Sequence, residues 1–132
     1  MGQRASGHHR GFTLIEMMVV ISVILILLAI AVPIYSQSMI RAREDNLRKN
    51  LRTLNGMIVQ YTLDKKKAPR SLEDLHHAGY IDSIPDDITG RKDWATEEDD
   101  SIMSPDQTDP GISGVHSESN HIGSDGRPYS EW

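Results

Sequence analysis

Glu16 is the residue whose chemistry is most unusual for its position. Its carboxylate stands between a basic leader and a long apolar run. An acidic side chain in a bilayer costs about 2–3 kcal/mol on insertion scales, so it persists where something uses it. The bland alternative is that Glu16 only reaches the lipid headgroups. The segment around Glu16 is therefore the first place to look for function.

The other reactive residue types do not form a catalytic pattern. The chain has no cysteine, which excludes a disulfide scaffold, a thiolate zinc site and a cysteine nucleophile. His116, Ser117 and Asp125 are the residue types of a catalytic triad, but no nucleophile elbow or oxyanion hole accompanies them. His76 and His77 are adjacent and diverge on a helix, which disfavours a zinc site. We therefore expect no enzymatic activity.

The apolar run Met17–Ile34 predicts a membrane helix. It is interrupted only by Ser22 and Pro33, and eighteen helical residues span about 27 Å, close to the thickness of a bilayer core. The basic residues before it predict a cytoplasmic N-terminus and an exported C-terminal part. No convincing small-x-small cleavage site follows the run, so we expect the segment to remain as an anchor.

The segment from Ser36 to about Asp64 predicts an amphipathic helix that continues the first one. Its apolar residues fall on one face; they are Ile40, Leu47, Leu51, Leu54, Ile58 and Tyr61. Glu44 and the basic side chains are assigned to positions off that stripe. Pro33 is expected to kink the helix or to open it locally. Together the two segments predict one helix of about 50 residues, apolar all round and then amphipathic.

The remaining residues predict a small head, so the expected fold class is α+β. A short helix follows Ser71 as its N-cap and ends before Gly79. Short strands are expected around Trp94, over Ile112–His116 and at Pro128–Trp132. The predicted organisation is a leader at 1–11, a transmembrane and assembly helix at 12–35, an amphipathic helix at 36–67 and a head at 68–132 that carries the short helix and a small antiparallel sheet.

Charge is segregated along the chain. Residues 36–70 carry nine Lys/Arg against three acidic residues, whereas residues 86–132 carry twelve acidic residues against three basic ones. Either both regions are ordinary solvated surface, or the basic stem meets the acidic head of a neighbouring subunit. The basic stretch is modest and lacks interleaved aromatic residues, so we expect no binding of nucleic acid.

The string Gly11-Phe12-Thr13-Leu14-Ile15-Glu16 resembles the class III signal of type IV pilins and of type II secretion pseudopilins. The resemblance implies that a prepilin peptidase cuts between Gly11 and Phe12 and N-methylates Phe12. It places Glu16 at the family's fifth mature position and Pro33 at its helix-breaking proline. A buried Glu16 carboxylate would then pair with the Phe12 amine of an adjacent subunit, because leaving either charge alone is costly. Glu16 and Pro33 are thus expected to act in assembly.

Further segments are similar to the G-type major pseudopilin of type II secretion; they are residues 41–44, 51–54, 60–65, 68–75, 79–81, 84–85 and, more loosely, 114–117, 124–126 and 129–132. The resemblance implies a structural subunit of the bacterial inner membrane, with a periplasmic head, that is extracted into a periplasmic helical filament of its own copies. Minor pseudopilins and an inner-membrane secretion platform are the implied partners. The alternative is a type IV pilin of a surface filament for adhesion, twitching or DNA uptake. A third possibility is an unrelated signal-anchored binding protein.

G-type pseudopilins bind calcium in a loop between their last strands, so the resemblance also implies a calcium site. The matching residues here are Ser117, Asp125 and the carbonyl of Val115. Calcium takes six to eight oxygen ligands, and Asp109, Glu118, Asn120 and Ser124 offer further ones. Gly114 stands where many members have aspartate. The alternative is a loop held only by turns and hydrogen bonds.

Overall fold

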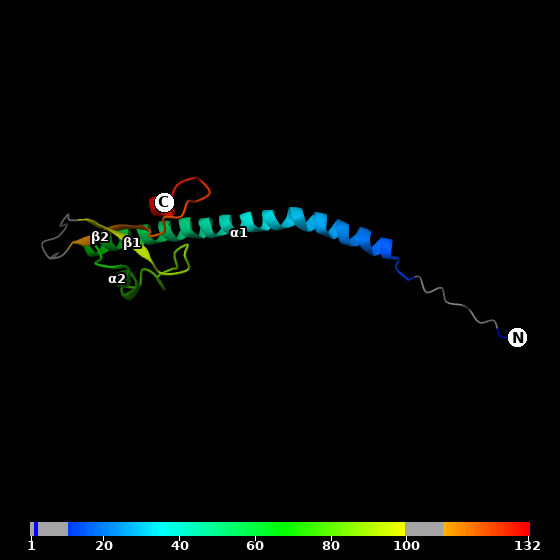
Figure 1. Ribbon diagram of the computed structural model, residues 1–132. Helices are drawn as coiled ribbons and strands as arrows, with labels where there is room; N and C mark the ends of the chain where they lie inside the picture. Colours follow the sequence, from blue (N-terminus) through cyan, green and yellow to red (C-terminus); the bar gives the residue numbers. More distant parts are fainter. Residues whose placement is uncertain (1, 3–10, 100–109) are drawn as a thin grey trace. The chain divides into compact units, whose positions relative to one another are not determined.

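The computed structural model describes residue 2 and residues 11–99 and 110–132 (Figure 1). Its elements are helix α1 (Leu14–Lys65), helix α2 (Leu72–His77), strand β1 (Trp94–Asp99), strand β2 (Gly111–Ser117) and the 3-10 turn η1 (Tyr129–Glu131). The chain divides into two compact units. We call residues 1–39 the N-terminal unit and residues 40–132 the head unit. The predicted α+β fold class is confirmed.

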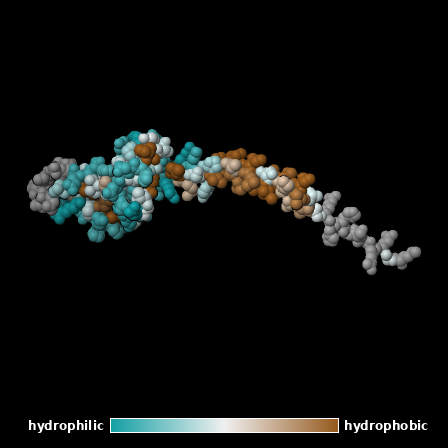
Figure 2. All heavy atoms as spheres, viewed as in Figure 1, coloured by the Kyte–Doolittle hydropathy of each residue, from teal (hydrophilic) through white to brown (hydrophobic). Residues whose placement is uncertain are grey.

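The N-terminal unit consists of the apolar part of α1. Among the described residues, α1 is the one helix long and apolar enough to cross a membrane by length and composition. Its side chains are exposed, with 78% for Leu14 and 62% for Val32, and Figure 2 shows the hydrophobic residues gathered along this part of the helix. Pro33 lies inside the helix. Such a continuous apolar surface requires cover by lipid or by protein.

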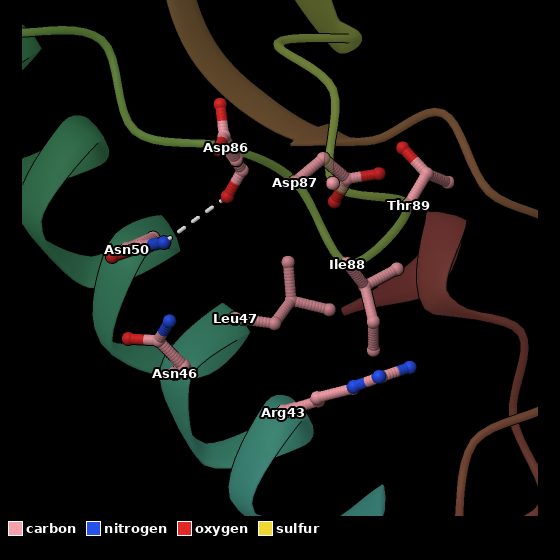
Figure 3. A pocket seen from close by; sticks show the side chains of 9 residues that line it. Arg43, Asn46, Leu47, Asn50, Asp86, Asp87, Ile88 and Thr89 are labelled. Atoms are coloured by element: carbon pink, nitrogen blue, oxygen red, sulfur yellow. Dashed lines mark hydrogen bonds between the residues drawn. The ribbon is translucent and has the colours of Figure 1, made fainter.

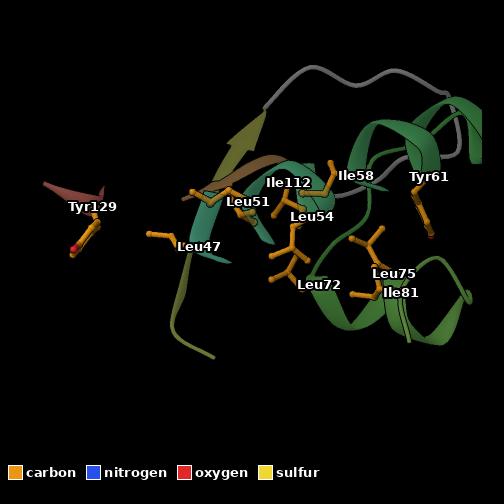
Figure 4. Close-up of a cluster of buried hydrophobic side chains, with 11 residues drawn as sticks. Leu47, Leu51, Leu54, Ile58, Tyr61, Leu72, Leu75, Ile81, Ile112 and Tyr129 are labelled. Carbon is orange, nitrogen blue, oxygen red and sulfur yellow. The ribbon is translucent and has the colours of Figure 1, made fainter. Parts of the chain in front are cut away.

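The head unit is built on the second part of α1. One face of the helix is buried in the core (Figure 4); its residues are Glu44, Leu47, Leu51, Leu54, Ile58 and Tyr61. The predicted stripe is therefore confirmed from Leu47 onward, but its predicted start is wrong because Ile40 is 51% exposed. The placement of Glu44 off the stripe is also wrong. Glu44 lies three residues before Leu47, and this spacing puts both on one helix face.

The end of α1 and the start of α2 follow local rules. Lys65 is the last helical residue, and Lys66 adopts a left-handed conformation with φ of 55°. Ser71 occupies the N-cap position of α2, but its side chain makes no capping bond. The Asp74 carboxylate instead accepts the Arg70 N–H at 2.9 Å. Gly79, with φ of 80°, follows the helix where a glycine is favoured. Leu72 and Leu75 are buried against the α1 face.

Strands β1 and β2 form an antiparallel pair with Trp94 opposite Ser117 and a register shift between Glu97 and Glu98. Asn55 of α1 joins the helix to β2. Its amide donates to the Val115 carbonyl at 3.1 Å, and its amide oxygen accepts the Val115 N–H at 2.9 Å. The side chain of Asn55 thus pairs with β2 as another strand would, and it fixes the sheet on the helix.

The third predicted strand, at Pro128–Trp132, is wrong. Residues 129–131 form the turn η1, in which the Glu131 N–H donates to the Pro128 carbonyl at 3.0 Å. Only an isolated bridge joins Ile122 to Pro128 within the described residues. Proline has no N–H to give to a ladder. The aromatic rings of this segment pack on each other, with Tyr129 and Trp132 edge to face at 5.0 Å between ring centroids.

Candidate functional site

The first candidate site is the segment that precedes α1. Residues 11–13 have no regular secondary structure and are exposed, and Phe12 is 75% exposed. Thr13 caps the helix. Its hydroxyl oxygen accepts the Glu16 N–H at 3.1 Å, and its carbonyl accepts the Met17 N–H at 3.1 Å. The Gly11–Phe12 peptide bond therefore lies just outside the first helical turn.

Glu16 lies in that first turn, where the helix dipole favours a negative charge. The side chain is exposed, and its carboxylate has no partner among residues 11–99 and 110–132. Pro33 lies inside the same helix. The structure thus leaves the predicted processing bond and the Glu16 carboxylate accessible to other molecules, which their predicted roles require.

The sequence analysis missed a buried polar cluster, which surrounds Glu44 in the head unit. Glu44 is 1% exposed. Its carboxylate accepts the Ser124 N–H at 2.7 Å and the Tyr129 hydroxyl at 3.0 Å, and it also accepts the Ser124 hydroxyl. Burial raises the pKa of Glu44, but the bonds from Ser124 and Tyr129 and the charge of Arg48 outweigh it, so the pKa lies below its ordinary value.

Tyr129 is held as the donor in this cluster, because burial and the Glu44 carboxylate raise its pKa. The cluster ties the segment after β2 to α1. Next to it, the Arg48 guanidinium lies over the Trp132 ring at 4.1 Å from the ring centroid. We call Glu44, Ser124 and Tyr129 the carboxylate clasp. Only its spacing from Leu47 and Leu51 could have revealed Glu44 from the sequence.

The three residues assigned to calcium are each engaged with other groups. The Val115 carbonyl accepts the Asn55 amide, and the Ser117 hydroxyl donates to Asp87 at 2.9 Å. Asp125 accepts the Arg127 guanidinium and backbone N–H. That N–H is the main reason why the pKa of Asp125 is lowered. Among the described residues, no hydrogen bond or ion pair joins any two of these three to each other.

Within the described residues, no group of three or more Asp, Glu or His side chains could hold a metal ion. Without such a group, the described donors fall short of the six to eight oxygen ligands that calcium takes. Asp109 lies outside the described residues. The calcium site remains a prediction.

A hollow of about 350 Å³ lies between α1 and the loop after Pro85 (Figure 3). Arg43 and Asn50 line one wall, and the Asn50 amide donates to the Asp86 carbonyl at 3.2 Å. Asp87 is 5% exposed. Its second carboxylate oxygen is shielded from solvent and has no hydrogen-bond partner among the described residues. Because that oxygen is closed off from solvent, the hollow does not offer it to a ligand.

Residues 7–32 match the family model "Prokaryotic N-terminal methylation motif". Over 75 residues, the chain is 32% identical to the competence protein ComGC of Halalkalibacterium halodurans; the match covers 57% of this chain and 74% of that protein. The chain belongs to the type IV pilin-like family. No solved structure matches it.

Membership of the pilin-like family explains the N-terminal unit. The methylation motif covers Gly11, Phe12 and Glu16, which makes the chain a prepilin-like substrate of a prepilin peptidase. The apolar helix fits the single membrane anchor of such a precursor. Pilin-like proteins are structural subunits. Neither similarity points specifically to the G-type secretion pseudopilin that the sequence resembles.

Proposed function

We propose that the chain is the filament subunit of a pseudopilus that serves competence, the uptake of DNA. Its similarity to a competence protein carries the proposal. That similarity extends over 75 residues, whereas the N-terminal unit has 39. It therefore includes part of the head unit, which the shared methylation motif at 7–32 cannot account for. This favours the DNA-uptake alternative over type II secretion.

In this proposal the precursor lies in the cell membrane with its N-terminus in the cytoplasm. A prepilin peptidase removes residues 1–11 and methylates the new terminus at Phe12. The apolar helix then leaves the lipid and packs among its own copies on an inner-membrane platform, with minor pseudopilins as further partners. The largely exposed apolar surface of α1 supports this, since only lipid or other helices can cover it.

Glu16 sets the register between neighbouring subunits. Its carboxylate is without a partner in the described structure, and cleavage creates one positive amine on each Phe12. A pair formed between two subunits satisfies both charges, whereas a subunit out of register leaves a buried charge unpaired, at a cost of about 3–5 kcal/mol. The role is structural, and no residue is assigned to catalysis. The acidic head need not contact DNA itself.

The second candidate is the secretion pseudopilus. It is favoured by the likeness of residues 41–85 to G-type pseudopilins. The two functions differ in what is lost when the gene is deleted. Transformation by added DNA, proteins in the culture supernatant and surface pili are therefore measured in the deletion strain. Loss of transformation alone supports the proposal, whereas loss of secreted proteins with intact transformation contradicts it and identifies the secretion pseudopilus.

Complementation tests the assembly role of Glu16. The deletion strain receives the wild-type gene, Glu16→Ala or the control Glu73→Ala, which removes an exposed acidic side chain of α2. Glu16→Ala is expected to insert and to be cleaved, yet to form no filaments and to restore no transformation. The control is expected to behave as wild type. Normal filaments from Glu16→Ala would disprove the register role.

A further inference from the structure

We propose that Thr13 is a positioning residue for removal of the leader, because its helix cap keeps the Gly11–Phe12 bond outside α1. The inference rests on the proposed function only in requiring that this bond is cleaved. Two independent observations meet at this place. The structure shows a capped helix start at residue 13, and the methylation motif that marks processing spans the same residues.

The cap at Thr13 sets where the helical hydrogen bonds begin. Its hydroxyl oxygen accepts the Glu16 N–H, and the Met17 N–H donates to its carbonyl. The carbonyls of Gly11 and Phe12 lie before this first bond, in exposed residues without regular structure. Within residues 11–99 and 110–132, no N–H donates to either carbonyl, so the described structure leaves both open to a peptidase.

Cleavage requires a free Gly11 carbonyl. In hydrolysis, the oxygen of a water molecule adds to the Gly11 carbonyl carbon, the bond from that carbon to the Phe12 nitrogen breaks, and a proton passes to the nitrogen. Negative charge builds on the Gly11 carbonyl oxygen during the addition, and a peptidase stabilises it with its own donors. A carbonyl that already accepts a helical N–H is not free to receive them.

Without the Thr13 cap, the helix has another place to begin. Glycine is about as good an N-cap as threonine, and both are much better than valine. If valine replaces Thr13, Gly11 becomes the preferred N-cap, and the helix extends by two residues. The Gly11 carbonyl then accepts the Ile15 N–H, which occupies the oxygen that cleavage needs. The cap at Thr13 thus protects the scissile bond from the helix that follows it.

The test measures cleavage of the full-length precursor in detergent or in vesicles by a purified prepilin peptidase. Thr13→Val keeps the branched shape but loses the hydroxyl, and it is expected to be cleaved about fivefold more slowly, the equivalent of about 1 kcal/mol for one cap. Thr13→Ser and Thr13→Asn keep a cap and are expected to be cleaved at the wild-type rate. Ser22→Ala removes a hydroxyl that bonds the Met18 carbonyl inside the same helix, and it serves as the matched control.

The variants separate a cap from simple recognition of the side chain. A peptidase that reads the shape of residue 13 would accept valine and reject asparagine, which is the reverse of the expected order. Faster cleavage of Thr13→Val than of Thr13→Asn, or equal rates for Thr13→Val and wild type, would overturn the inference while leaving the proposed function intact. If the wild-type precursor itself is not cut between Gly11 and Phe12, the proposed function fails instead.

Discussion

Replacing Glu44 with glutamine tests the carboxylate clasp of the head unit. The carboxylate is 1% exposed and accepts bonds from Ser124 and Tyr129. Glutamine has nearly the same shape, but it exchanges one acceptor oxygen for an NH₂ group and removes the charge. The Ser124 hydroxyl must then turn and accept from the NH₂ group, while the Ser124 N–H and the Tyr129 hydroxyl keep an uncharged acceptor oxygen. The change therefore probes the chemistry of the clasp with little change in packing volume.

The size of the effect follows from the number of bonds. A hydrogen bond to a charged group contributes about 1.5–3 kcal/mol, against about 0.5–1.5 kcal/mol for a neutral pair. Loss of the charge from the three bonds of the clasp, at about 1 kcal/mol each, gives an expected destabilisation of about 3 kcal/mol. For a domain of this size, that corresponds to a melting temperature lowered by roughly 12–24 °C.

The assay is thermal unfolding of the full chain in detergent, followed by tryptophan fluorescence. The two tryptophans, Trp94 and Trp132, both lie in the head unit, so the signal reports that unit alone. Asp45→Asn is the matched control. Asp45 is the exposed neighbour of Glu44 and pairs with Arg48 at 3.2 Å, and an exposed pair of this kind contributes at most about 1 kcal/mol.

Tyr129→Phe removes one donor of the clasp and completes a double-mutant cycle with Glu44→Gln. If the two groups interact as the structure shows, the double variant is destabilised by less than the sum of the single variants. A Glu44→Gln variant that melts within about 3 °C of wild type, or strictly additive effects in the cycle, would refute the reasoning.

Three further predictions concern the head unit. The pKa of Glu44 is lowered from 4.5, so the stability that this carboxylate contributes is present above pH 4.5 and is lost as the pH falls through its folded-state pKa. The melting temperature of the wild type should therefore fall more steeply below pH 4.5 than that of Glu44→Gln. Parallel melting curves for the two proteins would contradict this prediction. Asn55→Asp keeps the acceptor for the Val115 N–H but loses the donor to the Val115 carbonyl, so we expect the head unit to be destabilised by about 1–3 kcal/mol. Asn46→Asp, at an exposed α1 residue that lines the hollow, is expected to melt near wild type, and equal melting of both variants would show that the Asn55–Val115 bonds are unimportant. If calcium binds, chelation lowers the melting temperature, and Asp125→Ala has the same effect. Arg127→Ala breaks the same ion pair but is expected to keep the calcium response. Identical melting with calcium and with chelator would show that the head unit has no stabilising calcium site.

The long helix could be predicted because its evidence is local. Apolar residues recur at helical spacing from Leu47 to Tyr61, and Pro69 comes soon after the helix ends at Lys65. Glu44 was misplaced because its residue type outweighed its position, which repeats the spacing of the stripe. A buried carboxylate is tolerated only with donors around it. Here the donors come from Ser124 and Tyr129, 80 and 85 residues away, and no local pattern indicates them.

The C-terminal segment also shows that a local sequence pattern cannot reveal distant contacts; here the pattern predicted a strand that does not form. Pro128–Trp132 has the aromatic residues of a strand, and a local pattern cannot distinguish a ring that covers a sheet from one that packs on a turn. The structure decides through distant partners, since Trp132 lies against Arg48 and Tyr129 donates to Glu44. The two hydrogen bonds between Asn55 and Val115 of β2 join residues that are 60 positions apart. They likewise depend on a contact that only the folded chain reveals.

This division between local and distant evidence explains why the family is easier to identify than the function. The cleavage, methylation and charge pairing proposed for this chain involve residues 11–16, which need no neighbour from elsewhere in the chain and lie exposed at the start of α1. Any pilin-like machine can use that segment. Secretion and DNA uptake must then be distinguished by the head unit, whose surface depends on contacts such as the carboxylate clasp. A similarity that continues past residue 39 therefore carries more weight for function than a perfect methylation motif would.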